Sequence, residues 1–190
     1  MDKNFNYYKE NAKEYCEKTF VKGNLNTLLY FCSFVPNNSK ILDIGCGSGR
    51  DSLFFKKLNY EVEAIDYVPE ICEIASRNTN INVRRMNILN DNLNDTYQGI
   101  WANASLVHLS KDELKIVLNK IHKALDRNGY FYCSVKIKAM NDKSRDFLEI
   151  SIKEMEDLLK ENKFEIIEVW ESSDCFGRNN ILGNYLCKKL

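Results

Sequence analysis

The chain has 190 residues, of which 44% are hydrophobic and 28% are charged, and its 27 basic residues equal its 27 acidic residues. This length suits one domain with a substantial core, and the composition is that of a folded globular protein, so disordered and fibrous classes are excluded. A net charge of zero gives no overall positive field for a phosphate backbone, so nucleic acid is not a favoured partner.

The sequence predicts a cytoplasmic protein without a membrane partner. Residues 1–10 are polar and aromatic rather than apolar, and no apolar run approaches the roughly eighteen residues of a membrane span. The seven cysteines are odd in number and scattered, and none forms a Cys-x-x-Cys pair. We therefore expect reduced cysteines and no bound metal.

Residues 1–35 precede the first predicted strand and are expected to be helical. Tyr8, Ala12 and Tyr15 recur at helical spacing and share one face, as in an amphipathic helix.

From residue 40 onward, short apolar runs alternate with segments of helical period, which predicts repeated strand–helix units and a mainly parallel α/β sheet. The predicted strands are residues 40–44, 61–66, 82–86, 99–103, 130–135, 164–169 and 181–187. About ten residues without a helical pattern join the last two strands, which is too few for a parallel crossover, so the final strand is predicted to run antiparallel.

The predicted helices have recognisable starts and ends. Pro69 suits the first turn of one helix. A serine followed three residues later by a glutamate forms a capping box at Ser110 and again at Ser151. Asn128-Gly129 is predicted to end the helix that starts after Ser110. The helix after the first strand carries Leu53, Phe54 and Leu58 and is predicted to end near Asn59.

The first strand leads directly into a glycine turn with glycines at positions 45, 47 and 49. Glycine permits a tight turn and lets a ligand approach the backbone. A dinucleotide-binding turn of the Gly-x-Gly-x-x-Gly type needs a third glycine where this chain has Arg50. Asp43, two residues before the turn, would repel a pyrophosphate but suits a cationic ligand.

Asp66 ends the second strand, at the same edge of the sheet as the glycine turn. Its carboxylate could accept two hydrogen bonds from the hydroxyls of a ribose. It could instead cap the turn that follows the strand.

Together, Asp43, the glycine turn and Asp66 resemble class I S-adenosylmethionine-dependent methyltransferases, and the Gly49-Arg50 step resembles the small-molecule, tellurite-resistance type. The resemblance implies a Rossmann-like sheet of seven strands with helices on both faces. It also implies methyl transfer from S-adenosylmethionine, by in-line displacement, to a small-molecule acceptor, leaving S-adenosylhomocysteine. It extends over a single domain, 1–190, with a helical lid at 1–35 and a core at 40–190, in a monomer or homodimer.

The resemblance further implies which side chains contact the cofactor. They cluster after the strand ends and in the N-terminal segment: Tyr8, Asp43, Gly45, Cys46, Gly47, Arg50, Asp66, Tyr67, Asn87, Ile88 and Asn103. Arg50 could bind the methionine carboxylate, or it could pair with a surface acid. Asn87 replaces a frequent acid and could bond to the adenine edge or form a turn.

His108 follows the fourth strand and is the candidate catalytic base, with a pKa expected near neutrality. A local loop hydrogen bond is its alternative role. His122 lies on the flank of a helix and is assigned no chemistry. Trp101 and Trp170 are expected in the core.

Two segments are expected to form the acceptor-binding walls. They are the residues after the fifth strand, beginning with Lys136 and Lys138, and residues 171–180. The sequence has no Asn/Asp-Pro-Pro-Tyr segment, so exocyclic base nitrogens are not expected as acceptors.

Two other functions fit some of these residues. A binding module without catalysis would share the glycine turn and Asp66. A nucleotide-dependent oxidoreductase would need the third glycine that Arg50 replaces.

Overall fold

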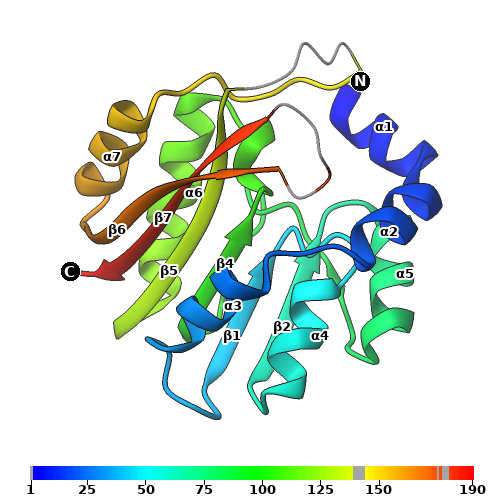
Figure 1. The fold of residues 1–190 in the computed structure, drawn as a ribbon, viewed down its shortest axis with the longest axis horizontal. Coiled ribbons are helices and arrows are strands. Elements are labelled where there is room, and N and C mark those ends of the chain that lie inside the picture. The colour runs from blue at the N-terminus through cyan, green and yellow to red at the C-terminus, as the bar shows by residue number, and fades with distance from the viewer. Residues whose placement is uncertain (1, 139–143, 175, 177–179) are drawn as a thin grey trace.

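The structure of the protein is a computed structural model that describes residues 2–138, 144–174, 176 and 180–190 (Figure 1). The strands in these residues form a seven-stranded sheet in the order β3-β2-β1-β4-β5-β7-β6. They are β1 (Lys40–Ile44), β2 (Glu61–Asp66), β3 (Arg84–Arg85), β4 (Tyr97–Asn103), β5 (Leu125–Lys138), β6 (Phe164–Ser173) and β7 (Ile181–Lys189). β1 to β5 are parallel, whereas β7 runs antiparallel to both β5 and β6. The predicted Rossmann-like sheet and its antiparallel last strand are confirmed.

Helices cover both faces of the sheet, as predicted. α6 (Lys111–Ala124) and α7 (Ile152–Glu161) pack on one face, and α3 (Leu25–Cys32), α4 (Arg50–Lys57) and α5 (Pro69–Thr79) pack on the other (Figure 1). Both capping boxes are present, at the N-termini of α6 and α7.

The second face buries an aromatic cluster in which Trp101 stacks on Tyr132 with ring centroids 4.0 Å apart. Phe31 of α3 and Phe55 of α4 pack against the same indole. The core position predicted for Trp101 is confirmed, while Trp170 is half-buried and packs on the edge of this cluster.

The predicted end of the helix after Ser110 is wrong. α6 stops at Ala124, because Leu125 is buried, has extended backbone angles and pairs with Tyr97 as the start of β5. Gly129 lies inside β5, at an irregularity where an added Cβ would come within 3.1 Å of the Tyr97 carbonyl oxygen. Glycine is therefore favoured at this position because the neighbouring strand leaves little room for a side chain, and not because the residue ends a helix.

Other element boundaries also differ from prediction. β3 is limited to Arg84–Arg85, while β4 begins earlier, at Tyr97, and β6 extends to Ser173 along its partner β7. In α4 the buried side chains are Asp51, Ser52 and Phe55, while Leu58 is 38% exposed and Leu53 and Phe54 are half-buried. Two polar residues therefore occupy the inner face of this helix, which ends at Lys57, close to the predicted end near Asn59.

The N-terminal segment forms α1 (Lys3–Glu10) and α2 (Ala12–Phe20), separated at Asn11, followed by α3. α1 and α2 lie beside α5 at the carboxyl end of the parallel strands (Figure 1), where Ala12 and Cys16 pack on Val68 and Ile71. Because α3 packs on the sheet, only α1 and α2 cover the strand ends.

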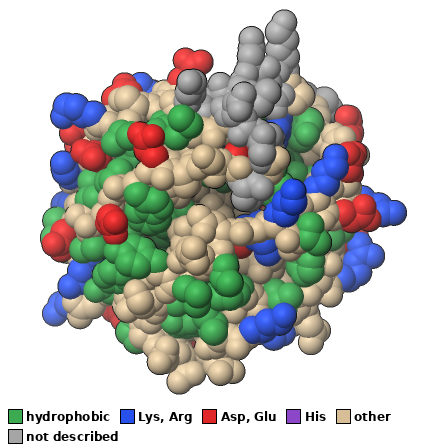
Figure 2. Space-filling model, in the orientation of Figure 1, with side chains coloured by type: hydrophobic (Ala, Val, Ile, Leu, Met, Phe, Trp, Pro, Cys, Tyr) green, Lys and Arg blue, Asp and Glu red, His purple; other side chains and the backbone are tan. Residues whose placement is uncertain are grey.

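The surface of the face seen in Figure 2 mixes charges of both signs, with Lys or Arg side chains beside Asp or Glu side chains. Hydrophobic side chains also gather there, and α3 leaves Leu25, Leu29 and Tyr30 partly exposed. Among the helices that the structure describes, none combines the length and apolar character needed to cross a membrane. The six cysteines in the described residues are free, and Cys175 lies outside them.

Candidate functional site

Two adjoining cavities open at the carboxyl ends of β1, β2 and β4, beneath α1 and α2. We call them the Asp66 cavity and the Lys136 cavity, after a polar residue in the wall of each. The two cavities have a common wall, formed by the residues that line both of them: Tyr8, Tyr15, Gly45, Gly47 and Ala104.

Every site residue predicted from the sequence lines one or both cavities. Those in the Asp66 cavity are Tyr8, Gly45, Gly47, Asp66, Tyr67, Asn87, Ile88 and His108. Those in the Lys136 cavity are Tyr8, Asp43, Gly45, Cys46, Gly47, Arg50 and Asn103. The fold therefore brings together residues from α1, α4 and the ends of four strands.

The glycine turn needs glycine for two separate reasons. Gly45 and Gly47 have φ of 65° and 54°, which L side chains rarely adopt. An added Cβ on Gly45 would lie 2.5 Å from the Cβ of Ser105. At Gly47 the bare backbone borders both cavities, and its N–H donates to Asp66 Oδ2 at 3.2 Å. The turn thus presents backbone, rather than side chains, to a ligand.

Asp66 is 7% exposed and accepts hydrogen bonds from the backbone N–H groups of Gly47 and Val68, at 3.2 and 3.1 Å. The bond from Val68 is the turn-capping role that the sequence left open. Burial raises the pKa of this carboxyl to about 6, against the effect of the backbone donors. A carboxylate has about four acceptor positions, so these two bonds leave room for donors from a ligand in the cavity.

A second buried acid lies on the other side of the turn. Asp43 is 2% exposed and accepts a hydrogen bond from Ser52 Oγ at 2.5 Å. Burial, followed by the nearby charge of Asp51, raises the pKa of Asp43. Two buried acids therefore lie beside the glycine turn, and a cationic ligand would favour their charged forms.

Asp51 is a site residue that the sequence analysis missed. Its carboxylate accepts from Trp101 Nε1 and Asn103 Nδ2, both at 3.0 Å, and from Arg50 Nε at 2.6 Å. Asn103 Oδ1 in turn accepts from Ser134 Oγ at 2.9 Å. The available signal was two polar residues at positions 51 and 52 on the face of α4 that packs on the sheet.

Arg50 joins the N-terminal segment to α4. Besides its bond to Asp51, its Nη1 donates to the carbonyl oxygens of Thr19, at 3.1 Å, and Lys22. Of the two roles open for Arg50, the structure contains the pairing with an acid, although that acid is buried rather than on the surface. Binding a ligand carboxylate through Arg50 stays a prediction.

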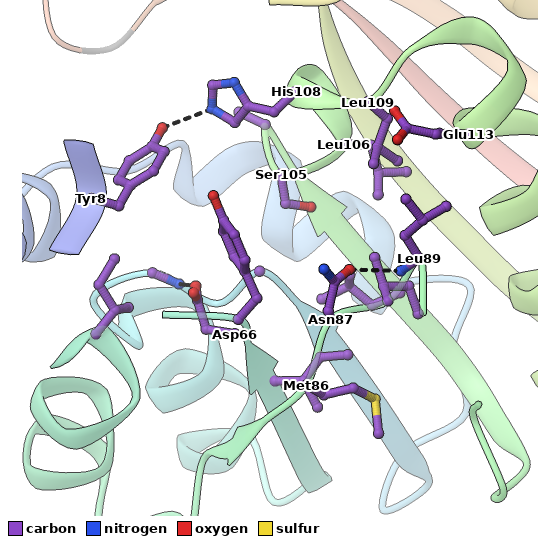
Figure 3. A pocket seen from close by; sticks show the side chains of 18 of the residues that line it. Tyr8, Asp66, Met86, Asn87, Leu89, Ser105, Leu106, His108, Leu109 and Glu113 are labelled. Atoms are coloured by element: carbon purple, nitrogen blue, oxygen red, sulfur yellow. Dashed lines mark hydrogen bonds between the residues drawn. The ribbon is translucent and has the colours of Figure 1, made fainter. Parts of the chain in front are cut away.

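Asn87 forms the turn that was its alternative role. Its Oδ1 accepts from the backbone N–H of Leu89 at 3.0 Å, and its own N–H donates to Asp91 Oδ2 at 2.8 Å (Figure 3). Its amide nitrogen can still act as a donor, and Ile88 beside it adds an apolar wall.

His108 and Tyr8 point toward each other at one side of the Asp66 cavity (Figure 3). His108 Nδ1 lies 2.7 Å from the carbonyl oxygen of Asp146, and Nε2 lies 2.9 Å from the Tyr8 hydroxyl. Because a carbonyl can only accept, Nδ1 carries the proton and Nε2 accepts from Tyr8.

Burial, together with the positive charges of Arg145 and Lys136, lowers the pKa of His108 to about 4. The expected pKa near neutrality is therefore wrong, because the ring lies in a covered, positively charged position. The predicted loop hydrogen bond is present, through Asp146.

The segment after β5, predicted as a wall, contributes two side chains that the sequence analysis did not name, Arg145 and Phe147. Arg145 Nη1 donates to the Tyr8 hydroxyl at 3.2 Å, and Phe147 lines the Lys136 cavity. Asp146 N–H donates to Asn4 Oδ1 at 2.8 Å, which ties this segment to α1. The side chain of the predicted wall residue Lys138, together with Gly177 and Arg178, lies outside the described residues.

Three other residues predicted as acceptor walls do line the Lys136 cavity: Lys136, Asp174 and Phe176. The described part of the chain contains no group of three or more side chains placed to hold a metal ion.

Comparison with known sequences gives a family match over residues 41–129, to the family described as "Methyltransferase domain". The chain is 26% identical over 96 residues to the probable S-adenosyl-L-methionine-dependent methyltransferase TehB of Haemophilus influenzae (strain 10810), covering 48% of this chain and 34% of that protein. It is 29% identical over 103 residues to the ribosomal protein L11 methyltransferase of Clostridium botulinum (strain Eklund 17B / Type B), covering 53% and 33%. These matches thus span about a third of the curated relatives.

Solved structures share the fold over almost the whole chain. The magnesium protoporphyrin IX methyltransferase of Synechocystis PCC 6803, with bound SAH, has a TM-score of 0.79 at 13% identity and covers 100% of both chains. The 1,6-didemethyltoxoflavin-N1-methyltransferase of Burkholderia thailandensis has a TM-score of 0.76 at 18% identity, covering 98% of this chain and 85% of that one. A TehB-like SAM-dependent methyltransferase from Corynebacterium glutamicum has a TM-score of 0.73 at 18% identity and covers 98% of both chains. At these identities the likeness is one of fold.

Proposed function

We propose that the chain is a class I S-adenosylmethionine-dependent methyltransferase of the TehB-like type and that it transfers a methyl group from S-adenosylmethionine to a small-molecule acceptor. The family match over residues 41–129 and the similarity to TehB support this proposal. We treat residues 1–190 as a single methyltransferase domain with α1 and α2 as its lid. The observation that carries the proposal is the joining of Asp66 and the glycine turn in one cavity wall.

The residues of the Asp66 cavity fit the donor. Asp66 retains acceptor positions for the ribose hydroxyls. Ile65, Ile71, Met86 and Ile88 provide apolar contacts for the adenine. The acids around the glycine turn, Asp43 and Asp51 among them, suit the positive charges of a sulfonium and an ammonium.

When bound, S-adenosylmethionine supplies a methyl group on a positively charged sulfur. An acceptor lone pair forms the new bond to this methyl carbon, and the electron pair of the broken bond stays on sulfur. The protein contributes orientation and proximity, through the common wall of the two cavities, and α1 and α2 exclude water.

His108 remains the candidate proton acceptor for the reaction. Its Nε2 accepts a hydrogen bond from the Tyr8 hydroxyl. A proton that leaves the methyl acceptor can therefore pass to Tyr8 while the hydroxyl proton of Tyr8 passes to Nε2. A base of pKa about 4 takes up protons weakly at neutral pH. Base catalysis by His108 is therefore restricted to acceptors that lose a proton easily.

The test measures binding and turnover separately. Calorimetry with S-adenosylmethionine and S-adenosylhomocysteine examines the donor site, and a broad set of acceptors, assayed for S-adenosylhomocysteine by mass spectrometry, examines catalysis. We expect donor binding in both experiments and acceptor-dependent product. Binding without turnover would favour the non-catalytic module, whereas stabilisation by NAD instead of S-adenosylmethionine in a thermal-shift assay would favour an oxidoreductase.

A further inference from the structure

Acidic side chains lie at one end of the Lys136 cavity and basic side chains lie at the other. Asp43 and Asp51 line it beside the glycine turn, where Arg50 also lines it and is paired with Asp51. Lys136 and Arg145 line it on the side of β5 and the segment that follows. A cavity polarised in this way orients a charged ligand by its field.

The basic end is built from buried or half-buried groups. Lys136 is 9% exposed, and its Nζ lies 3.3 Å from the centroid of the Phe147 ring. Arg145 is half-buried, and its guanidinium carbon lies 4.4 Å from the ring centroid of Tyr7 and 5.1 Å from that of Phe147. Aromatic faces stabilise and orient such cations. The fold therefore holds two long cationic side chains in fixed positions. Exposed lysines on a protein surface are, by contrast, flexible and solvated.

Lys136 and Arg145 both lie near the hydrogen-bonded pair of Tyr8 and His108. Both lower the pKa of His108, which accepts a hydrogen bond from Tyr8, the hydroxyl to which Arg145 donates. Tyr8 belongs to the wall shared with the donor cavity. The positive end of the Lys136 cavity therefore lies next to Tyr8, in the wall that the two cavities share.

Apolar side chains complete this end. Phe147, Phe176 and Leu182 line the same cavity, together with the ring of Tyr15. Asp174 also lines it, and its carboxylate accepts from the backbone N–H of Phe176 and from Asn180 Nδ2, both at 2.8 Å. The cavity thus combines cationic donors with aromatic and aliphatic surface.

We propose that the methyl acceptor is a small organic acid with a flat apolar body, whose carboxylate is bound by Lys136 and Arg145 while its body packs on Phe147 and Phe176. This inference rests on the proposed function and names the substrate class for it. The acidic end of the cavity repels such an acceptor and attracts the cationic donor, so the charges sort the two molecules into opposite positions. The acceptor atom then faces the wall that both cavities share.

The experiment compares pairs of probes that differ only in charge. A panel of hydroxy- and amino-substituted aromatic and heteroaromatic carboxylic acids is titrated beside the corresponding primary amides, with S-adenosylhomocysteine present. We expect carboxylates to bind at least about tenfold more tightly than their amides, as charge-assisted hydrogen bonds imply. Lys136→Met and Arg145→Gln should each reduce this preference, and Lys136→Arg should retain most of it.

A matched control is Lys153→Met, which removes an exposed lysine whose side chain is 84% exposed and remote from the cavity walls. Thermal unfolding of each variant separates loss of binding from loss of fold. Amides that bind as well as carboxylates would overturn the inference, as would the binding of no panel acid while S-adenosylhomocysteine still binds. Failure of the wild type to bind S-adenosylhomocysteine or S-adenosylmethionine would instead contradict the proposed function itself.

Discussion

The two cavities differ in how their walls are assembled. Most of the Asp66 cavity comes from residues that directly follow β1, β2, β3 and β4. The Lys136 cavity adds side chains from β5 and from later parts of the chain: Lys136, Arg145, Phe147, Asp174, Phe176 and Leu182. The first kind of wall is set by the topology of a parallel sheet, because the carboxyl ends of its strands meet at one edge. The second kind of wall depends on where the long connections that follow β5 and β6 pack against the sheet edge. Shared sheet topology can thus preserve a donor site while the acceptor site varies.

The largest effect is expected from a substitution in the wall that both cavities share. Gly47→Val places a β-branched side chain at φ 54° and brings its Cβ to within about 3.4 Å of the Tyr15 hydroxyl. We expect donor binding to fall by more than about 100-fold, with some loss of stability on the order of 1–2 kcal/mol. Calorimetry with S-adenosylhomocysteine measures the loss.

Gly47→Asn is the control, because asparagine tolerates positive φ better than valine does. It should leave the fold more stable than Gly47→Val does. A valine variant with wild-type affinity would remove the glycine turn from the donor site.

Asp66→Ala should affect one cavity and spare the other. Loss of the charge-assisted bonds to the ribose is expected to weaken donor binding by about 2 kcal/mol, roughly 30-fold. Binding of organic acids in the Lys136 cavity, measured without donor, should change little. Equal affinity of wild type and Asp66→Ala for S-adenosylhomocysteine would exclude the ribose role.

The acids beside the glycine turn should reduce the stability of the ligand-free protein as pH rises. The pKa values of Asp43 and Asp66 are raised by burial, Asp66 to about 6, so the folded state binds more protons than the unfolded state between about pH 4 and the raised pKa values. The free energy of unfolding therefore falls as pH increases through this window.

Asp43→Asn should lessen this fall and stabilise the ligand-free protein above pH 7, by on the order of 1 kcal/mol or a few degrees in Tm. Chemical denaturation from pH 4 to pH 8 measures the effect. A steeper decline in the variant than in the wild type would contradict the assignment of a raised pKa to Asp43.

The smallest effect is expected from the hydroxyl that connects α1 to His108. Tyr8→Phe removes both hydrogen bonds of this hydroxyl, the one to His108 Nε2 and the one from Arg145 Nη1, and should accelerate dissociation of S-adenosylhomocysteine up to about fivefold. Tyr7→Phe, which keeps the ring against Arg145, is the matched control and should dissociate at the wild-type rate. Stopped-flow displacement gives both rates, and identical rates for the two variants would show that the Tyr8 bond does not retain the ligand.

The sequence predicted the parts of the structure that depend on local chemistry or sheet topology. The capping boxes at Ser110 and Ser151 and the glycine turn were of this kind. The prediction that Asn128-Gly129 ends a helix was wrong because glycine, which has no side chain, is favoured both at helix ends and at irregular positions in strands.

Site features that depend on distant parts of the chain could not be predicted. The low pKa of His108 results from burial under α1 and from charges on β5 and the next segment, none of which is close in sequence. Arg145 reaches Tyr8 across 137 positions of the chain. Asp51 was overlooked because a helix face containing aspartate and serine has no apolar periodicity, although it is buried here.

The placement of Tyr8 and Tyr15 has a kinetic consequence. Their rings lie 5.0 Å apart, one on α1 and one on α2, and each contributes to both cavities. A movement that lifts the two helices together uncovers both compartments, so escape of either product passes through a common barrier. Under such gating, turnover slows as solvent viscosity increases, and the two products leave with correlated rates rather than independently.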